Sequence, residues 1–218
     1  MKIVNKFSNL FRPKVGKGSP GEQDLELYWD PSMAEVLETW GQGNAWREIE
    51  LLLAGCEGPV LDIACGTGKV MEMLSKSKRL VIYGCDISDF LIAKAVDRGI
   101  SKDLLTVCDA TRTGYNDGFF NHAYSIGSLE HFTEEGITGC LRECHRVTRK
   151  TSFHMVPVSR DNQDQGWIKT HQSYFNNSDQ WWLSKFKSVY KGVVALDSVW
   201  SDDWSTGKWF VCFKTPKW

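Results

Sequence analysis

A glycine-rich turn between an apolar run and a helical pattern is the feature that most constrains this sequence. The run at residues 60–64 leads into Cys-Gly-Thr-Gly at residues 65–68, and a helix-like pattern begins at once. Gly66 and Gly68 can adopt backbone angles that other residues disfavour, and they leave no Cβ in the way of a ligand. The helix start behind them offers unpaired N–H groups. Many α/β folds use such a turn, so its meaning depends on the strands and acidic residues that come after it.

Strand and helix patterns alternate after this turn. Strand-like runs occupy residues 59–64, 79–86, 104–108, 119–127 and 151–158. The alternation predicts βαβ units and a parallel sheet. Two later runs, 190–200 and 208–215, have a short link, so we expect them to pair antiparallel. The sequence therefore predicts an α/β, Rossmann-like, doubly wound sheet, mostly parallel with an antiparallel last strand, and a helical N-terminal cover at residues 22–55.

Acidic residues stand at the ends of the second and third predicted strands. Asp86 ends the second strand, eighteen residues after Gly68, and Asp109 follows the third strand. A carboxylate at the first place can accept hydrogen bonds from both hydroxyls of a ribose. A carboxylate at the second place can accept a bond from an adenine amino group. Ligands of open α/β sheets bind at this edge, near the switch in strand order.

The segments DIACGTG, CDIS, CDAT and SIGSLEH resemble the motif series of class I S-adenosylmethionine-dependent methyltransferases, over about residues 58–158. The resemblance implies that S-adenosylmethionine is the cofactor. It also implies a set of cofactor-binding residues, namely Asp62, Ala64, Gly66, Gly68, Asp86, Ile87, Asp109 and Ala110. Ala64 replaces the usual first glycine, and Asn121 replaces an aspartate that often begins the fourth strand. Binding of NAD is disfavoured, because the third glycine of GxGxxG is missing.

Composition indicates one ordinary globular domain, expected at residues 22–218. The formal net charge of −1 gives no global electrostatic reason to bind nucleic acid. The seven cysteines are scattered and odd in number, which favours reduced thiols and a cytoplasmic protein. Cys140 and Cys144 are spaced as two metal ligands on a helix could be, but a second ligand pair is missing, so we expect no metal.

Residues 1–21 differ from the rest of the chain, because they carry five basic residues and no acidic one. Apolar residues recur at helical spacing over residues 2–11, and a cluster of glycine, serine and proline comes next. One interpretation is a solvated tail and linker. The other is a basic amphipathic segment that makes weak contact with a membrane surface or a partner. The second interpretation would make the enzyme peripheral to a membrane.

Histidines near the predicted sheet edge are candidates for a catalytic base. His131, preceded by Glu130, follows the fourth strand, and His171 lies in the stretch after the fifth strand. A neutral histidine can take a proton from a hydroxyl near pH 7. His154 lies within an apolar strand and is interpreted as structural.

Aromatic residues cluster after the fifth strand, where such enzymes commonly build the acceptor pocket. Trp167, Tyr174 and Trp181 are the candidate substrate residues. Aromatic faces suit sugars, aromatic rings and lipid portions alike. The alternative is that Trp181 and its neighbour Trp182 only cover the core.

Together these features predict methyl transfer from S-adenosylmethionine to a hydroxyl of a small molecule or glycan. Oxygen is favoured because histidine, and no Asn-Pro-Pro-Tyr-type motif, follows the fourth strand. One alternative is an N-methyltransferase that acts on an amine or a protein. Another is a non-catalytic module that keeps the cofactor-binding fold.

Overall fold

A seven-stranded sheet forms the centre of the computed structural model, which describes residues 23–41 and 44–215. The strand order is β3-β2-β1-β4-β5-β9-β8. The strands are β1 (Gly58–Ile63), β2 (Leu80–Asp86), β3 (Leu105–Val107), β4 (Phe120–Ile126), β5 (Thr148–Ser159), β8 (Gly192–Ser201) and β9 (Ser205–Phe213). The order reverses between β1 and β4, which places a topological switch point beside the glycine turn. The predicted doubly wound sheet is confirmed.

The last strand, β9, runs antiparallel to both of its neighbours, as the short link predicted. It pairs with β5 from Thr151↔Phe213 to Ser159↔Ser205. Asp202 tightens the β8–β9 turn, because its Oδ1 accepts bonds from the N–H groups of Trp204 at 2.8 Å and Ser205 at 2.7 Å. The remaining pairs, β1–β2, β1–β4, β2–β3 and β4–β5, are parallel.

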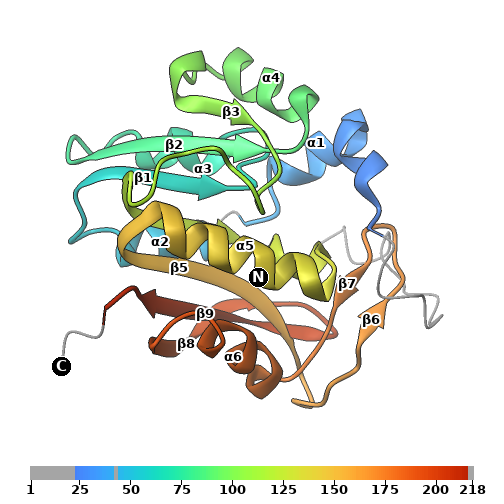
Figure 1. Ribbon diagram of the computed structural model, residues 1–218. Helices are drawn as coiled ribbons and strands as arrows, with labels where there is room; N and C mark the ends of the chain where they lie inside the picture. The colour runs from blue at the N-terminus through green and yellow to red at the C-terminus, as the bar shows by residue number, and fades with distance from the viewer. Residues whose placement is uncertain (1–22, 42–43, 216–218) are drawn as a thin grey trace, which may run out of the picture.

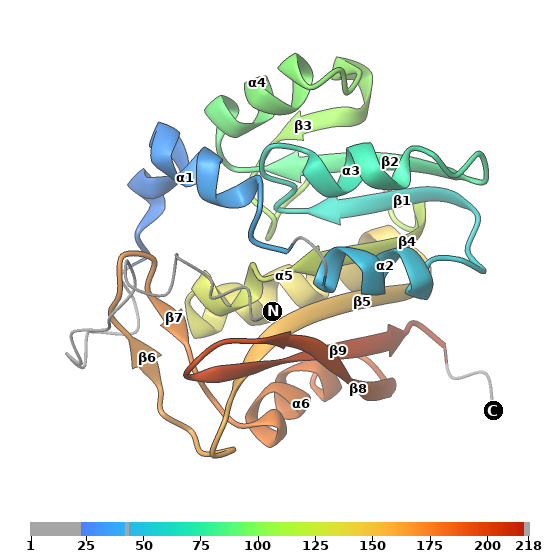
Figure 2. The same ribbon diagram turned by 180° about the vertical axis from the view of Figure 1, so that it is seen from behind.

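Helices cover both faces of the sheet (Figures 1 and 2). One face packs against α2 (Ala45–Leu52), α3 (Lys69–Leu74) and α4 (Asp89–Asp97), and the other against α5 (Glu134–Val147) and α6 (Asp179–Lys187). Local sequence explains where two of them begin. The Ser88 side chain caps α4 by accepting a bond from Leu91 N–H, and Thr133 caps α5 by accepting one from Gly136 N–H. None of the helices in the described ranges is long and apolar enough to cross a membrane.

Two further segments lie at the carboxyl ends of the parallel strands (Figures 1 and 2). One is the N-terminal cover, made of η1 (Leu25–Trp29) and α1 (Pro31–Leu37). The other is a hairpin of β6 (Trp167–Ile168) and β7 (Tyr174–Phe175), which the sequence did not predict. Each of these strands has two residues, which is too short for an alternating pattern to appear. Residues 1–21, expected to form a basic tail, lie outside the described residues.

His154 is a core residue of β5, as its place within an apolar strand indicated. Its Nδ1 lies 2.8 Å from the Ser125 hydroxyl, and its Nε2 lies 3.8 Å from the Cys144 sulfur. Burial lowers the pKa of His154 to about 3. The folded protein therefore keeps this imidazole neutral at pH values where the unfolded chain protonates it.

We expect His154 to make the protein sensitive to acid. Between about pH 6.5 and pH 3 the unfolded state binds a proton here that the folded state refuses, so stability falls as the pH falls. The loss is about 2 kcal/mol at about pH 5. In His154→Gln, the change in unfolding free energy between about pH 7 and pH 5 should be smaller by that amount, measured by urea unfolding. An unchanged pH dependence would contradict the assignment.

Candidate cofactor and active site

The turn after β1 has the left-handed backbone that its sequence suggested. Gly68 has φ +72°, and a Cβ placed there would lie 2.9 Å from the Cβ of Ala95 on α4. Ala64, which stands where glycine is usual, also has a positive φ of 56°. That conformation costs a non-glycine residue about 1–2 kcal/mol. The backbone thus explains why glycine is usual at this place and why a small alanine is tolerated.

Asp86 links the end of β2 to this turn. Its Oδ2 accepts a bond from Gly66 N–H at 2.9 Å, and its Oδ1 accepts one from Ser88 N–H at 3.0 Å. Burial raises the pKa of the Asp86 carboxyl, although these N–H groups oppose the rise. Asp62 lies deeper, where it accepts a bond from the Tyr124 hydroxyl at 2.8 Å. Asp62 is thus tied to Tyr124 on β4, and Asp86 is tied to the glycine turn.

Asp109 and Ala110 follow β3 at the same edge of the sheet. Cys108 N–H donates to the Asp86 carbonyl oxygen at 2.9 Å, which ties the ends of β2 and β3 together. Asp109 is exposed, and its Oδ1 accepts a bond from Thr111 N–H at 2.7 Å. Ala110 is buried, whereas Ile87 is 36% exposed. The structure therefore brings the predicted cofactor-binding residues to neighbouring strand ends.

The N-terminal cover contacts the glycine turn through residues that sequence reasoning missed. The Thr67 hydroxyl donates to Glu38 Oε1 at 2.8 Å, and Arg98 Nε donates to the Thr67 carbonyl oxygen at 2.8 Å. Arg98 and Glu38 also form an ion pair. A Cβ added to Gly127, after β4, would lie 2.5 Å from the Trp40 ring. Charged and aromatic contacts thus hold the cover over the edge.

Glu130 and His131 lie after β4 in η3 (Leu129–His131). Glu130 is 3% exposed, and its Oε2 has no hydrogen-bond partner among the described residues. Its Oε1 lies 3.7 Å from His131 Nε2. The other ring nitrogen, Nδ1, lies 2.9 Å from the Ser173 carbonyl oxygen, which can only accept, so Nδ1 carries the proton and Nε2 keeps a lone pair.

The two side chains have shifted pKa values in opposite directions. Burial raises the pKa of Glu130 to about 8 and lowers the pKa of His131 to about 4. A proton acceptor works best when its pKa is near the working pH. By that criterion Glu130 suits proton transfer at neutral pH better than His131, which the sequence favoured. The signal for Glu130 was an acidic residue shortly after the fourth strand, next to His131.

Residues 23–28, which we call the strap, run from the carboxyl end of β2 to the β6–β7 hairpin. Gln23 Nε2 donates to the His131 carbonyl oxygen at 2.9 Å, and Ser173 N–H donates to Asp24 Oδ2 at 2.9 Å. Gln172 Nε2 donates to the Tyr28 hydroxyl at 3.0 Å. Burial raises the pKa of Tyr28, and the charges of Glu130 and Asp86 add to the rise. Tyr28 therefore lies within electrostatic reach of both acids.

The remaining predicted residues have different surroundings. Tyr174 lies beside His131, with ring centroids 6.4 Å apart. Trp167 is buried against Phe175, and Trp181 packs between Phe175 and Trp182. His171 is exposed in the hairpin loop, where it lowers the pKa of the Asp30 carboxyl after the contribution of Ser32. The structure thus places Tyr174 beside the Glu130–His131 pair and His171 in an exposed loop.

Among the residues that the structure describes, no group of three or more His, Cys, Asp or Glu side chains is arranged to hold a metal ion. Cys140 and Cys144 are both buried in α5.

Comparisons with known proteins agree with this geometry. Residues 60–151 match the family described as "Methyltransferase domain". The chain is 32% identical over 120 residues to a probable tRNA methyltransferase 9B of Mus musculus, a match that covers 54% of this chain and 26% of that protein. It is 30% identical over 115 residues to a ubiquinone/menaquinone biosynthesis C-methyltransferase of Desulfotalea psychrophila, covering 51% of this chain and 46% of that protein. The chain thus spans less than half the length of these relatives.

A solved structure extends the likeness to nearly the whole chain. It is the 1,6-didemethyltoxoflavin-N1-methyltransferase of Burkholderia thailandensis, with bound 1,6-didemethyltoxoflavin and S-adenosylhomocysteine. Its TM-score is 0.73 at 15% identity, and the alignment covers 94% of this chain and 95% of that one. That structure shares the fold described above, and the matched residues 60–151 of this chain include the glycine turn, Asp86 and Asp109. Residues 60–151 therefore match a methyltransferase domain, and nearly the whole chain shares the fold of this solved methyltransferase.

Proposed function

We propose that this chain transfers a methyl group from S-adenosylmethionine to a hydroxyl of a small molecule or glycan. The observation that carries the choice of oxygen is the buried Glu130–His131 pair, with its unpartnered Oε2 and its free Nε2. A hydroxyl must lose a proton when it is methylated, so its enzyme gains from a proton acceptor at the site. An amine that arrives uncharged needs no such group to begin the attack.

The cofactor would lie along the edge from β1 to β4. Gly66 and Gly68 give it a cradle without side chains, Asp86 accepts bonds from the ribose hydroxyls, and Asp109 accepts one from the adenine amino group. Asp62, Ala64, Ile87 and Ala110 shape the same surface. Bound S-adenosylmethionine supplies a methyl carbon that its sulfonium has already activated.

The chain's own residues would then position the acceptor and take its proton. The acceptor hydroxyl donates its hydrogen bond to the Glu130 carboxylate, and His131, whose Nε2 lies 3.7 Å from Glu130 Oε1, packs beside it. As the oxygen–carbon bond forms and the carbon–sulfur bond breaks, the hydroxyl proton passes to the Glu130 carboxylate. Tyr174, Trp167 and Trp181 form the apolar side of the acceptor pocket in this proposal. Positioning supplies much of the remaining rate.

The experiment is a turnover assay with methyl-labelled S-adenosylmethionine. Phenols and sugars are offered in parallel with primary amines and with tRNA, and S-adenosylhomocysteine is measured by mass spectrometry. Methylation of a phenol or sugar hydroxyl supports the proposal. Turnover with amines alone would favour the N-methyltransferase alternative, and turnover with tRNA would replace the small-molecule acceptor. Cofactor binding without turnover on any acceptor would favour a binding module.

We also propose that residues 1–21 attach the enzyme weakly to anionic membranes. Each of the five basic residues near an anionic surface contributes about 1 kcal/mol. We expect the full chain to sediment with phosphatidylserine vesicles at low salt and less at physiological salt. A version that starts at Glu22 should remain in the supernatant. Equal sedimentation of the two proteins would refute the attachment.

A further inference from the structure

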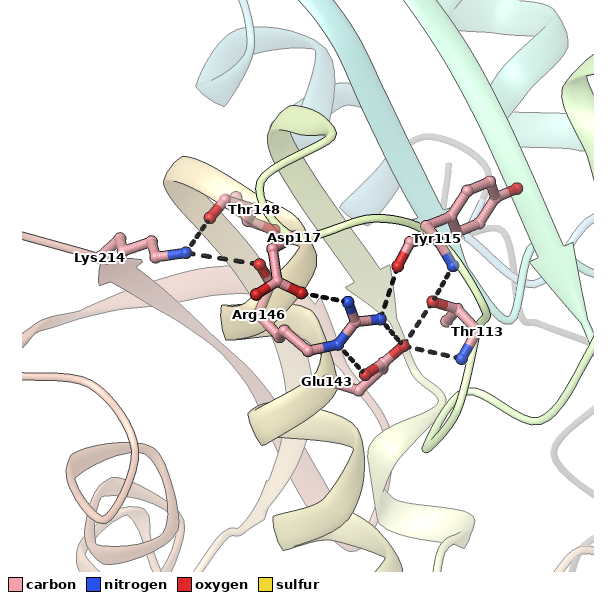
Figure 3. Close-up of polar contacts among 7 residues, drawn as sticks. All are labelled: Thr113, Tyr115, Asp117, Glu143, Arg146, Thr148 and Lys214. Atoms are coloured by element: carbon pink, nitrogen blue, oxygen red, sulfur yellow. Dashed lines mark hydrogen bonds and ion pairs between the residues drawn. The ribbon is translucent and has the colours of Figure 1, made fainter.

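One face of α5 runs alongside the loop that comes after β3. Gly139, Glu143 and Arg146 recur at helical spacing and so share this face. A Cβ added to Gly139 would lie 3.3 Å from Cγ2 of Thr111, a tight contact, so glycine lets the loop approach α5 closely there. One turn further along α5, Glu143 contacts Thr113, and Arg146 contacts the residues beyond it (Figure 3).

Glu143 is the centre of this contact. Its Oε1 accepts two bonds from Thr113, one from the backbone N–H at 2.8 Å and one from the hydroxyl at 2.6 Å. Glu143 is 8% exposed and Thr113 is 6% exposed, so water has little access to these bonds. Burial would raise the pKa of Glu143, but the bonds from Arg146 and Thr113 hold it below its ordinary value. Glu143 therefore stays ionised as it holds the loop.

Arg146 completes the attachment from the other side. Its Nε donates to Glu143 Oε2 at 2.8 Å, so the guanidinium holds the carboxylate in one orientation. The same guanidinium donates to the Tyr115 carbonyl oxygen at 2.7 Å and to Asp117 Oδ1 at 2.5 Å. Lys214 Nζ, from the segment after β9, donates to the Thr148 carbonyl oxygen at 2.8 Å (Figure 3). The loop is thus fixed at three successive points, Thr113, Tyr115 and Asp117.

Asp109 and Ala110 lie between this attachment and the end of β3. On the strand side, Cys108 N–H holds the loop to β2 through the Asp86 carbonyl oxygen. Within the loop, Asp109 is bonded to Thr111 N–H and Arg112 N–H, which move with it. The Glu143–Thr113 bonds, next to the close approach of Thr111 to Gly139, are therefore the polar contacts that connect the loop carrying Asp109 to α5. A shift at Thr113 would pass through three residues, 110–112, to the Asp109 carboxylate.

We propose that Glu143 is a positioning residue, which through Thr113 holds the loop carrying Asp109 where it can recognise the amino group of the cofactor's adenine. The proposal rests on the proposed cofactor site, but it concerns a residue outside that site. It assigns the selectivity for adenine, over a base without the amino group, jointly to Asp109 and to the α5 face behind it.

The test compares two ligands and two variants by titration calorimetry. S-adenosylhomocysteine carries the amino group, and S-inosylhomocysteine carries an oxo group in its place, which cannot donate to Asp109. We expect the wild type to prefer the first ligand by about tenfold or more. Glu143→Gln should weaken binding of S-adenosylhomocysteine by about tenfold and should hardly change binding of S-inosylhomocysteine, so the preference is lost. Glu135→Gln, at an exposed position of the same helix, should keep it.

Hydrogen exchange in the absence of ligand tests the contact directly. The amides of residues 110–115 should exchange faster in Glu143→Gln than in the wild type, and saturating S-adenosylhomocysteine should restore part of their protection. Thr113→Val removes only the hydroxyl donor, so it should show the same changes to a smaller extent, even where the glutamine variant is poorly folded.

Two results would overturn the proposal. One is an equal loss of affinity for both ligands in Glu143→Gln, because a general loss of structure does not distinguish the two bases. The other is unchanged exchange of residues 110–115. If the wild type bound neither ligand, the proposed function itself would fail, and the exchange comparison would still decide whether Glu143 holds the loop.

Discussion

Replacing Glu130 with glutamine is expected to stabilise the protein at neutral pH and to slow methyl transfer to a hydroxyl by about 10²–10⁴. The two effects have one origin. Glu130 is almost fully buried and its Oε2 has no partner among the described residues, so the folded protein resists its ionisation. The proposed reaction requires the ionised form. Replacing the carboxylate therefore removes the free-energy cost of keeping this group buried in the folded state, and it also removes the proton acceptor.

The gain in stability depends on pH in a defined direction. Burial raises the pKa of Glu130 from 4.5 to about 8. Between those values the folded state keeps a proton that the unfolded chain has released, so stability falls as the pH rises. The loss is on the order of 3 kcal/mol at about pH 7. Glutamine cannot ionise, so the melting temperature of Glu130→Gln should exceed that of the wild type more at about pH 7 than at about pH 5.

The rate should depend on the same ionisation. Wild-type turnover should rise with pH up to about 8, and the residual rate of Glu130→Gln should lack this rise. Glu135→Gln, which changes an exposed residue of α5, should match the wild type in both measurements. His171→Ala separates the alternatives, because a loss of rate there would move the base to the exposed hairpin loop. A stable, fully active Glu130→Gln protein would refute the role of Glu130.

Replacing Asp86 with alanine is expected to weaken S-adenosylhomocysteine binding by about 1.5–3 kcal/mol, or roughly 10–150-fold. In the proposed cofactor site, the change removes a charged acceptor for two ribose hydroxyls. It also leaves Gly66 N–H and Ser88 N–H without the carboxylate that now accepts from both. The glycine turn therefore loses a contact that holds it against the end of β2.

Titration calorimetry measures this loss, and circular dichroism reports whether the fold is intact. Asp97→Ala changes an exposed carboxylate on α4 and is the matched control, for which we expect wild-type affinity. Asp86→Asn separates the two contributions, because its amide oxygen can still accept one bond from the turn. An intact Asp86→Ala protein with unchanged affinity would remove Asp86 from the cofactor site.

The sequence predicted the parts of this molecule that depend on local patterns. Each of these parts can be recognised from a few consecutive residues. They are the turn at residues 65–68, the acids at the ends of β2 and β3, and the helix caps at Ser88 and Thr133. The antiparallel β9 was predictable from the length of one link.

The parts that depend on distant contacts could not be predicted. The β6–β7 hairpin has too few residues for a period, and its role comes from contact with η3 and the strap. Glu143 is one acidic residue among several on α5, and only the fold brings it to Thr113. The sequence named His131 as a candidate base, but the burial that separates the pKa values of Glu130 and His131 is a property of the folded environment.

The strap also determines when during folding the edge of the sheet is completed. Gln23, Asp24 and Tyr28 bond to residues that lie 108, 149 and 144 positions further along the chain. The strap therefore cannot complete these contacts until the chain has been made past residue 173. Contacts this distant in sequence close large loops and form slowly. These three bonds reach η3 and the β6–β7 hairpin and no strand of the central sheet, so the strap can detach while the sheet stays folded.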